Sequence, residues 1–347
     1  MNTTTIGLDI AKAVFQVHGI DARGQTTLRK RLRRAQLVTF FANLPPCLIG
    51  IEACASAHHW ARELSRLGHE VKLMSPQFVK PYVKTNKNDA RDAEAICEAV
   101  RRPNMRFVAI KTVAQQELLM LHRVRQRLVL ERTAKANQLR GLLAEFGIVL
   151  PQGVFALERG VPEVLADAEN ALSDRVRERF SQLFAQLRAL GVTVREWEQE
   201  ILAWHRDNPW SRRLEKIPGI GPLGASALVA SIGDIRTFKS GRQLAAWLGL
   251  VPRQDSSGGK TRLLGISKRG DRYLRTLLIL GARAVLRQMQ RHPGAAHSWL
   301  GRLTARSHPH IAAVALANKN ARIVWALLAH EREYQANYCA RVARAPA

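Results

Sequence analysis

Apolar and polar positions along the first hundred residues follow two alternating spacings. Short runs with the spacing of strands are separated either by a turn or by a segment with helical spacing. The pattern predicts strands over residues 5–10, 15–20, 25–32, 47–52 and 70–74, and helices over residues 36–44, 57–67 and from about residue 88. Strands that pair first through hairpins and then alternate with helices predict a mixed sheet covered by helices.

Two longer stretches then have the spacing of amphipathic helices. They cover about residues 113–146 and 163–205, and the segment from Gly147 to Pro162 reads as the connection between them. An antiparallel coiled-coil arm accounts for this pattern. A helical bundle within one chain accounts for it equally well.

A glycine-rich turn marks the third region of the chain. Gly219 and Gly221 lie within residues 217–225, and an apolar helix follows over residues 227–232. A helix, a Gly-x-Gly turn and a second helix form a helix-hairpin-helix, whose backbone N–H groups meet a DNA phosphate. The alternative is a tight turn between two core helices.

The charge of the chain indicates a polyanionic partner. Its 347 residues include 54 Lys and Arg against 28 Asp and Glu, a formal net charge of +26, while a hydrophobic content of 46% excludes a disordered chain. Residues 241–347 hold 18 of the basic and 4 of the acidic residues. On one predicted helix, five arginines fall within about half the circumference: Arg272, Arg275, Arg283, Arg287 and Arg291. We interpret this stripe as facing phosphates; a solvated face is the alternative.

A membrane is a weaker candidate partner than nucleic acid. No uninterrupted apolar run approaches the roughly 18 to 20 residues of a membrane-spanning helix, and the best candidate, residues 274–286, is broken by Arg275 and Arg283. Residues 1–5 lack the features of a secretion signal, so we expect a cytoplasmic, nucleoid-associated protein. The four cysteines are scattered along the chain and form no CxxC pair: Cys47, Cys54, Cys97 and Cys339. This spacing argues against a zinc site and against a disulfide framework.

Four carboxylates occupy positions that chain geometry could bring together. Asp9 and Glu52 each stand at the end of a predicted strand, and Asp89 and Asp92 share one face of a predicted helix at i, i+3 spacing. Such a cluster repels itself unless a divalent cation neutralises it, so the pattern is typical of a site for one or two Mg²⁺ ions that assist phosphoryl transfer. Taken singly, each acid also fits a structural role, as a strand-end turn residue or a first-turn helix residue.

A serine-containing loop follows within the basic region. Ser256 and Ser257 precede two glycines in residues 251–262, and cations surround them at Arg253, Lys260, Arg262, Lys268 and Arg269. A serine oxygen in this setting could act on a phosphate whose charge the cations stabilise. The alternative is a flexible linker.

Taken in order, these motifs resemble those of a known family. They are Gly7 to Lys12, Ile51 to Cys54, Lys87 to Ala93, Ile217 to Gly221 and Ser256 to Lys260. The set resembles the DEDD transposases of bacterial insertion sequences, in the IS-one-ten family and its IS-eleven-eleven subgroup. The resemblance covers about residues 5–150 and 210–290.

The resemblance implies a RuvC-like domain with the ribonuclease H fold over residues 1–110 and a mainly α-helical transposase domain over 209–347. Between them, residues 111–208 hold the helical coiled-coil arm that the apolar spacing predicts. The resemblance also implies catalysis by Mg²⁺ bound to Asp9, Glu52, Asp89 and Asp92. A serine nucleophile that matches Ser257 best, with Ser256 as the alternative, would form a covalent 5′-phosphoserine link to DNA.

The partners implied by the resemblance are double-stranded donor and target DNA, a structured noncoding guide RNA, and further copies of the chain in a dimer or tetramer. We expect nucleic-acid contacts from Gly219, Gly221, Arg253, Lys260, Arg262, Lys268, Arg269, Arg272 and Arg275. Two other functions remain alternatives. One is a RuvC-like nuclease or junction resolvase without a covalent intermediate, and the other is a noncatalytic architectural DNA-binding protein.

Overall fold

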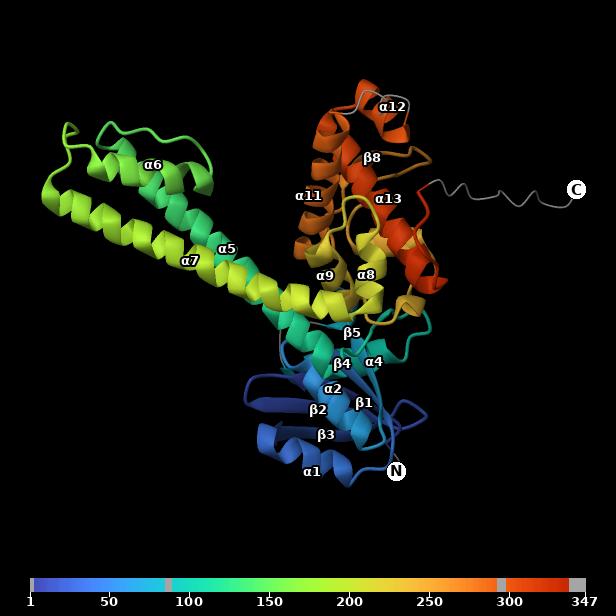
Figure 1. Ribbon diagram of the computed structural model, residues 1–347. Helices are drawn as coiled ribbons and strands as arrows, with labels where there is room; N and C mark the ends of the chain where they lie inside the picture. Colours follow the sequence, from blue (N-terminus) through green and yellow to red (C-terminus); the bar gives the residue numbers. More distant parts are fainter. Residues whose placement is uncertain (1–2, 85–88, 292–297, 337–347) are drawn as a thin grey trace, which may run out of the picture. The chain divides into compact units, whose positions relative to one another are not determined.

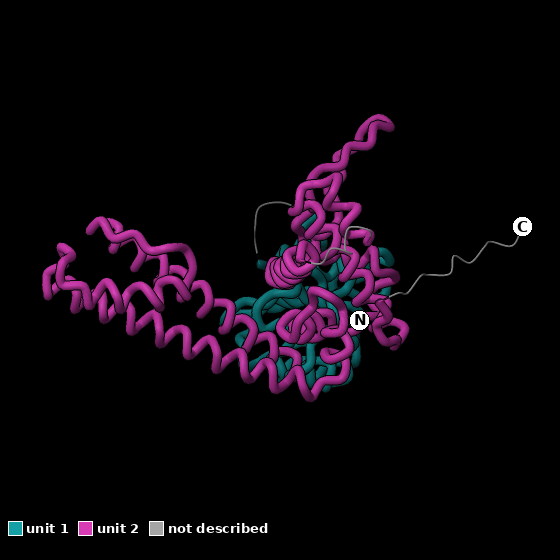
Figure 2. Tube along the Cα trace, turned by 45° about the horizontal axis from the view of Figure 1, so that its top comes forward, with its two compact units in different colours: residues 1–113 teal, residues 114–347 magenta. Residues whose placement is uncertain are grey.

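The computed structural model describes residues 3–84, 89–291 and 298–336. The chain divides into two compact units, residues 1–113 and 114–347, which Figure 2 colours separately. The first unit holds the predicted sheet. The second holds both the predicted arm and the helical C-terminal region, so the predicted boundary at residues 208 and 209 lies inside one compact unit.

A six-stranded mixed sheet forms the centre of the first unit (Figure 1). Its strands are β1 (Thr5–Ile10), β2 (Val14–Ile20), β3 (Thr26–Arg33), β4 (Leu48–Glu52), β5 (Glu70–Met74) and β6 (Phe107–Val108), in the spatial order β3-β2-β1-β4-β5-β6. β1, β2 and β3 pair antiparallel, whereas β1, β4 and β5 run parallel. The mixed sheet confirms the sequence prediction and is consistent with a ribonuclease H-like fold of the DEDD type.

Helices cover both faces of this sheet. The apolar side chains of β1, such as Ile6 and Leu8, share a core with residues of α1 (Leu37–Ala42) and α2 (Ala57–Arg66). α4 (Asp89–Val100) packs on β1, β2 and β4. Successive strand residues point to opposite faces of the sheet. Gly7 and Asp9, which alternate with Ile6 and Leu8, therefore face α4. The short helix α3 (Pro76–Val79) and the 3₁₀ turns η1 (Arg34–Gln36) and η2 (Lys80–Tyr82) complete the connections.

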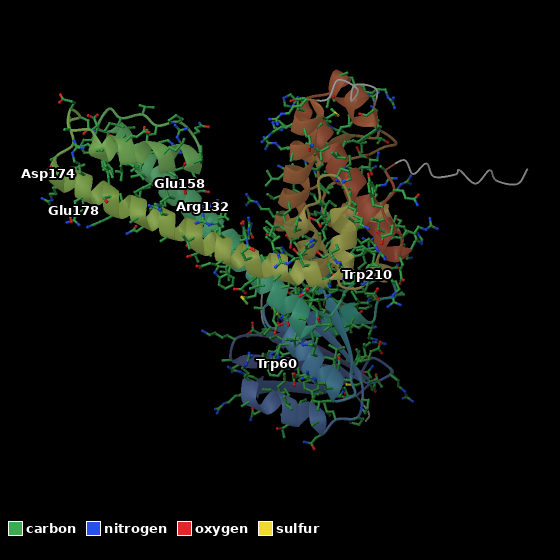
Figure 3. The ribbon with its side chains drawn as sticks, in the orientation of Figure 1. Trp60, Arg132, Glu158, Asp174, Glu178 and Trp210 are labelled. Carbon is green, nitrogen blue, oxygen red and sulfur yellow. The ribbon has the colours of Figure 1, made fainter. Side chains whose placement is uncertain are left out.

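The predicted arm contains three helices where the sequence pattern predicts two. They are α5 (Val113–Ala144), α6 (Val154–Ala166) and α7 (Asp174–Asp207). A shared apolar cluster joins α6 to α5 and α7 through Leu139, Leu157, Val161 and Leu187, all fully buried. In Figure 3 the labelled acids Glu158, Asp174 and Glu178 lie at the α6 end of this arm. A three-helix cluster therefore stands where a two-helix arm is expected, and the coiled coil itself stays a prediction.

The arm differs from the prediction at two points. The expected connection up to Pro162 is largely helical, because burial of Leu157 and Val161 on α6 offsets the N–H that Pro162 lacks. The expected helix over residues 163–205 is broken between α6 and α7. There Asn170 Nδ2 donates a hydrogen bond of 2.7 Å to Val164 O. The Arg177 guanidinium donates to backbone oxygens at the end of α6 and to Leu172 O within the break.

The C-terminal region of the second unit is mainly helical. It contains α8 (Pro209–Glu215), α9 (Pro222–Ile232), η3 (Ile235–Thr237), α10 (Gly241–Trp247), β7 (Pro252–Gln254), β8 (Leu263–Ile266), α11 (Arg272–Met289), α12 (Trp299–Arg306) and α13 (Pro309–Ala329). α11 and α13 pack against each other, and their apolar side chains join those of α8, α9 and α10 in one core. This arrangement confirms a mainly α-helical C-terminal region.

α13 needs separate mention because of its composition. In the described part of the chain, it is the one helix that is long and apolar enough to cross a membrane. Sequence reasoning singled out residues 274–286 as the best candidate and passed over this helix. Ala313, Ala317, Ala321 and Val324 of α13 are buried in the C-terminal core, as is usual for the central helix of a folded domain.

Candidate active site

The close packing of α4 against β1 positions the first predicted acid, Asp9. A Cβ at Gly7 would overlap the Ala93 carbonyl oxygen and the Cys97 amide on α4, so only glycine lets the helix lie this close to the strand. Asp9 lies two residues further along β1 and therefore points to the same face as Gly7. The close approach of α4 thus brings its acidic first turn near Asp9. An interior strand glycine is the sequence signal for this approach, and it was missed.

Strand register places Glu52 beside Asp9. Leu8 of β1 lies opposite Ile51 of the parallel strand β4, and both strands continue by one or more residues. The next residues, Asp9 one residue before the end of β1 and Glu52 at the end of β4, therefore lie on neighbouring strands on the face that α4 covers. The sequence prediction that both acids stand at adjacent strand ends agrees with this geometry.

The last two predicted acids begin α4. Asp89 and Asp92 lie in its first turn, as their i, i+3 spacing predicts. Lys87 and Asn88 of the same motif lie outside the described residues. The short strand-to-helix distance at Gly7 and the position of these acids at the start of α4 bring all four carboxylates to one end of the sheet.

The electrostatics of Asp9 show that the four carboxylates interact. Burial, followed in order by the charges of Asp92, Asp89 and Glu52, raises the pKa of Asp9 from its ordinary value of 3.8 to about 6. Asp9 is therefore hard to ionise while its three neighbours carry charge and no cation is near. We call Asp9, Glu52, Asp89 and Asp92 the acidic tetrad.

The acidic tetrad suits a hard divalent cation in its chemistry. Carboxylate oxygens are the ligands that Mg²⁺ prefers, and four of them surround one end of the sheet. Among the described residues, however, no three His, Cys, Asp or Glu side chains converge at the distances of a metal site. The donor set fits Mg²⁺, and its binding stays a prediction.

The serine loop is a β-hairpin, not the flexible linker of the alternative interpretation. β7 and β8 pair antiparallel, and a second pairing joins Ser257 to Lys260 at the tip, where Lys260 N donates to Ser257 O at 3.0 Å. The two residues between them, Gly258 and Gly259, both have positive φ, as a two-residue hairpin turn requires. We call residues 250–268 the serine hairpin.

The two serines of this hairpin differ in their surroundings. Ser256 Oγ accepts hydrogen bonds from Arg262 N at 3.2 Å and from Gln254 Nε2 at 3.0 Å, so it helps to hold the two strands together. Ser257 is exposed next to the turn, and its Oγ makes no hydrogen bond to any residue that the structure describes. Of the two serines, Ser257 is therefore the better candidate for the predicted nucleophile.

Most of the predicted nucleic-acid contacts are accessible. The exposed side chains are those of Arg253, Lys260, Arg262, Lys268, Arg269 and Arg272. Arg275 is an error of the sequence prediction, because it is only 8% exposed and donates to the backbone oxygens of Leu248 and Arg269. It therefore faces the core and not a phosphate.

The glycine-rich turn connects two helices as predicted. It follows α8 and ends at Gly221, the exposed N-cap of α9. Its other side is anchored in the core, since Asn320 Nδ2 donates to Pro218 O at 2.8 Å and Gly219 lies against the backbone of Gly281 on α11. Both the helix-hairpin-helix and the core turn are compatible with this geometry, and contact with DNA stays a prediction.

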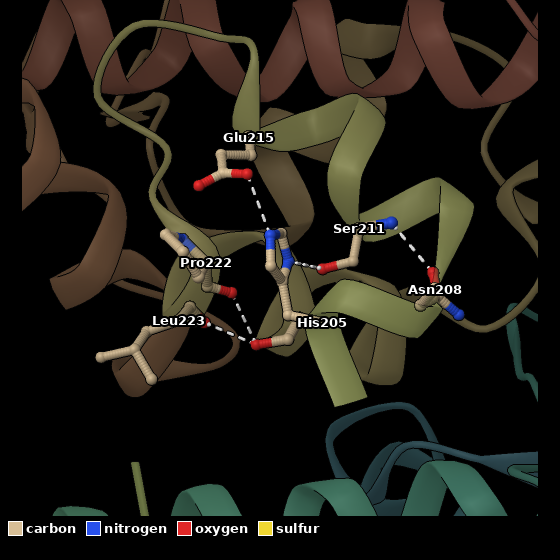
Figure 4. A network of polar contacts seen from close by, with 7 residues as sticks. His205, Asn208, Ser211, Glu215, Pro222 and Leu223 are labelled. Carbon is tan, nitrogen blue, oxygen red and sulfur yellow. Dashed lines mark hydrogen bonds and ion pairs between the residues drawn. The ribbon is translucent and has the colours of Figure 1, made fainter. Parts of the chain in front are cut away.

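A buried polar network beside this turn has the residue types of a hydrolytic triad. His205 Nδ1 lies 2.7 Å from Ser211 Oγ, and His205 Nε2 lies 2.9 Å from Glu215 Oε2 (Figure 4). Ser211 is fully buried, and its backbone N–H donates to the N-cap Asn208. A substrate cannot reach this hydroxyl, so the network secures the corner between α7 and α8 and is not a second active site.

Comparison with known proteins gives the family. Residues 6–148 match the model of the DEDD transposases of IS110, and residues 211–298 match that of the transposase IS116/IS110/IS902 family. A probable family 20 transposase of Pseudomonas aeruginosa is 52% identical over 96% of this chain and 99% of its own length.

Two further relatives are named after their mobile elements. The transposase for insertion sequence element IS1111A of Coxiella burnetii is 46% identical over 95% of this chain and 91% of its own length. The transposase for insertion sequence element IS1328 of Yersinia enterocolitica is 45% identical over 93% of this chain and 96% of its own length. The match extends through both compact units. This chain therefore belongs to the IS110 (IS-one-ten) family of DEDD transposases, enzymes that act on DNA.

Proposed function

We propose that this transposase cuts and rejoins double-stranded DNA through Ser257 as nucleophile and the acidic tetrad as a Mg²⁺ site, under the direction of a structured noncoding RNA. It acts in the cytoplasm, on the nucleoid, and mobilises its own insertion sequence. The observation that carries the proposal is the meeting of four carboxylates at one end of the sheet, two from neighbouring strands and two from the first turn of the helix packed on them.

In the proposed step, Ser257 Oγ forms a bond to a DNA phosphorus and the bond from that phosphorus to the 3′ oxygen breaks. The product is a 5′-phosphoserine link and a free 3′-hydroxyl, which takes up one proton as the serine hydroxyl loses one. Mg²⁺, when bound by the tetrad, neutralises its carboxylates and stabilises charge on the phosphoryl oxygens. The exposed cations Arg253, Lys260 and Arg262 hold the phosphate at the hairpin.

The proposed roles of the protein and of the guide RNA determine which partners the transposase needs. The exposed cations grip nucleic-acid backbones without reading their sequence, so base pairing with the guide RNA supplies specificity. The tetrad of one subunit completes the serine site of another, which requires a dimer or tetramer. Light scattering that gives a monomer with and without nucleic acid would contradict this assembly.

The test compares DNA products of purified variants with Mg²⁺ and the element's own RNA. Asp9→Asn, Glu52→Gln, Asp89→Asn, Asp92→Asn and Ser257→Ala should each abolish excision and leave the fold intact. Ser256→Ala and Glu158→Gln, an exposed acid on α6, are the matched controls and should retain excision. Digestion of the trapped adduct should map the phosphate to Ser257.

Each alternative predicts another result. Cut DNA with free 3′-hydroxyl and 5′-phosphate ends and no protein adduct would indicate a RuvC-like nuclease or resolvase. A phenotype unchanged by Asp9→Asn and by removal of Mg²⁺ would indicate an architectural DNA-binding protein. Normal excision by Ser257→Ala would overturn the serine assignment.

A further inference from the structure

Arg275 joins the two ends of the serine hairpin. Its Nη1 donates to Leu248 O at 3.0 Å and to Arg269 O at 2.8 Å. Leu248 lies two residues before the hairpin begins at Leu250, and Arg269 directly follows its end. One buried side chain on α11 therefore contacts the backbone on both sides of the segment that carries Ser257.

The first of these contacts satisfies a helix end. α10 ends in a Schellman motif, in which Gly249 N donates to Ala246 O and Leu250 N donates to Ala245 O, each at 3.0 Å. Gly249 has the positive φ of 71° that this motif requires. A cation at the negative end of a helix dipole is stabilised, which offsets part of the cost of burying the Arg275 charge.

The backbone at the hairpin base is packed too tightly for side chains. A Cβ at Gly249 would overlap Arg269 O, and a Cβ at Gly270 would overlap Trp247 O. Lys268 N donates to Gly249 O at 3.2 Å, and Ser267 N donates to Val251 O at 2.8 Å. The two ends are thus held together by backbone contacts and by the Arg275 guanidinium.

We propose that Arg275 is a positioning residue for the transposase reaction, because it fixes the base of the serine hairpin and so the direction in which Ser257 is presented. This inference rests on the proposed role of Ser257. Arg275 itself does not touch DNA. A planar guanidinium suits this place better than an ammonium, because it is more weakly hydrated and can donate to two oxygens in a fixed geometry.

The test measures hairpin order and chemistry separately in Arg275→Met and Arg275→Lys. Without DNA, limited digestion by trypsin after the exposed Lys260 and Arg262 should be about tenfold faster in Arg275→Met, since local opening becomes easier. Arg287→Met removes an exposed charge from the same helix and should leave this digestion unchanged. Arg275→Lys should give an intermediate rate.

With DNA and guide RNA, Arg275→Met should bind within about threefold of the unmodified protein and form the phosphoserine adduct at least tenfold more slowly. Unchanged digestion and adduct formation in a folded Arg275→Met would overturn the proposal. If that variant does not fold, Arg275→Lys decides in the same way, and failure of both to fold would also overturn it, since Arg275 would then serve the whole core. If Ser257→Ala still forms the adduct, the assignment of Ser257 as the nucleophile is wrong. The digestion assay would still test whether Arg275 holds the two ends of the hairpin together.

Discussion

Asp9 lies near the end of its strand and close to three other carboxylates. Because its pKa is raised from 3.8 to about 6, ionisation costs more in the folded than in the unfolded chain. Its neutral form therefore stabilises the fold at pH 4, and this contribution is lost as pH rises through 6.

The corresponding prediction concerns Asp9→Asn. In EDTA, the variant should melt at a higher temperature than the unmodified protein at pH 7.5, and the difference should vanish near pH 4. Added Mg²⁺ should raise the melting temperature of the unmodified protein at pH 7.5 more than that of the variant. Thermal unfolding followed by circular dichroism checks this, and coincident pH profiles in EDTA would contradict it.

Single residues also show what could be read from sequence. The tetrad could be found because strand-end acids and an i, i+3 pair leave a pattern. Arg275 looked like part of an exposed stripe, yet it precedes the buried Leu278 by three residues and the buried Ala282 by seven, which places it on the buried helix face. The burial of Arg275 could therefore have been predicted from this spacing. Its hydrogen-bond partners could not, because they are backbone oxygens and do not depend on residue type.

Three helices of the second unit meet at His122. His122 of α5 lies 3.0 Å from Tyr273 Oη of α11 and 3.1 Å from Ser226 Oγ of α9. Burial lowers the pKa of His122 to about 4, with a smaller effect from Arg125. The neutral form therefore stabilises the fold fully above pH 6.5, and this contribution is lost as pH falls towards 4.

We predict that acid weakens this packing through His122. Urea unfolding at pH 7.5 and 4.5 should show a loss of stability of at most about 3 kcal/mol from this group, and His122→Gln should lose correspondingly less. His310→Gln, at an exposed position, should behave like the unmodified protein. An equal loss in His122→Gln would refute the assignment.

Elements differed in how well sequence pattern predicted them. For the five longer strands and for α5, the predicted bounds lie within two residues of the observed ones, because the apolar spacing of these elements is regular. The break before α7 depends on side-chain bonds of Asn170 and Arg177 to backbone oxygens, and α6 contains a proline that sequence reasoning treats as a stop. Such local hydrogen bonds and burial override periodicity.

At the scale of the whole molecule, the net charge of +26 predicts salt-dependent binding. Contacts with about six to ten phosphates would lower DNA affinity by roughly 10³ to 10⁵ between 50 and 200 mM salt. Arg253→Gln, Arg262→Gln and Lys268→Gln should each reduce the salt slope by about one.

Fluorescence anisotropy over this salt range measures that slope. Arg236→Gln serves as the control, because Arg236 pairs with Asp234 and lies outside the proposed contacts. A flat salt response, or an equal change of slope in the control, would be incompatible with a backbone-gripping surface around the serine hairpin.

The edges of the six-stranded sheet bear on how subunits meet. β3, at one edge, exposes Arg29, Lys30, Arg31 and Arg33, and β6, at the other, is two residues long. Like charges on one edge and a short strand on the other both discourage pairing with a strand of another copy. Growth of the sheet across copies of the chain is therefore disfavoured, so an assembly of several copies would have to use surfaces other than these two strand edges.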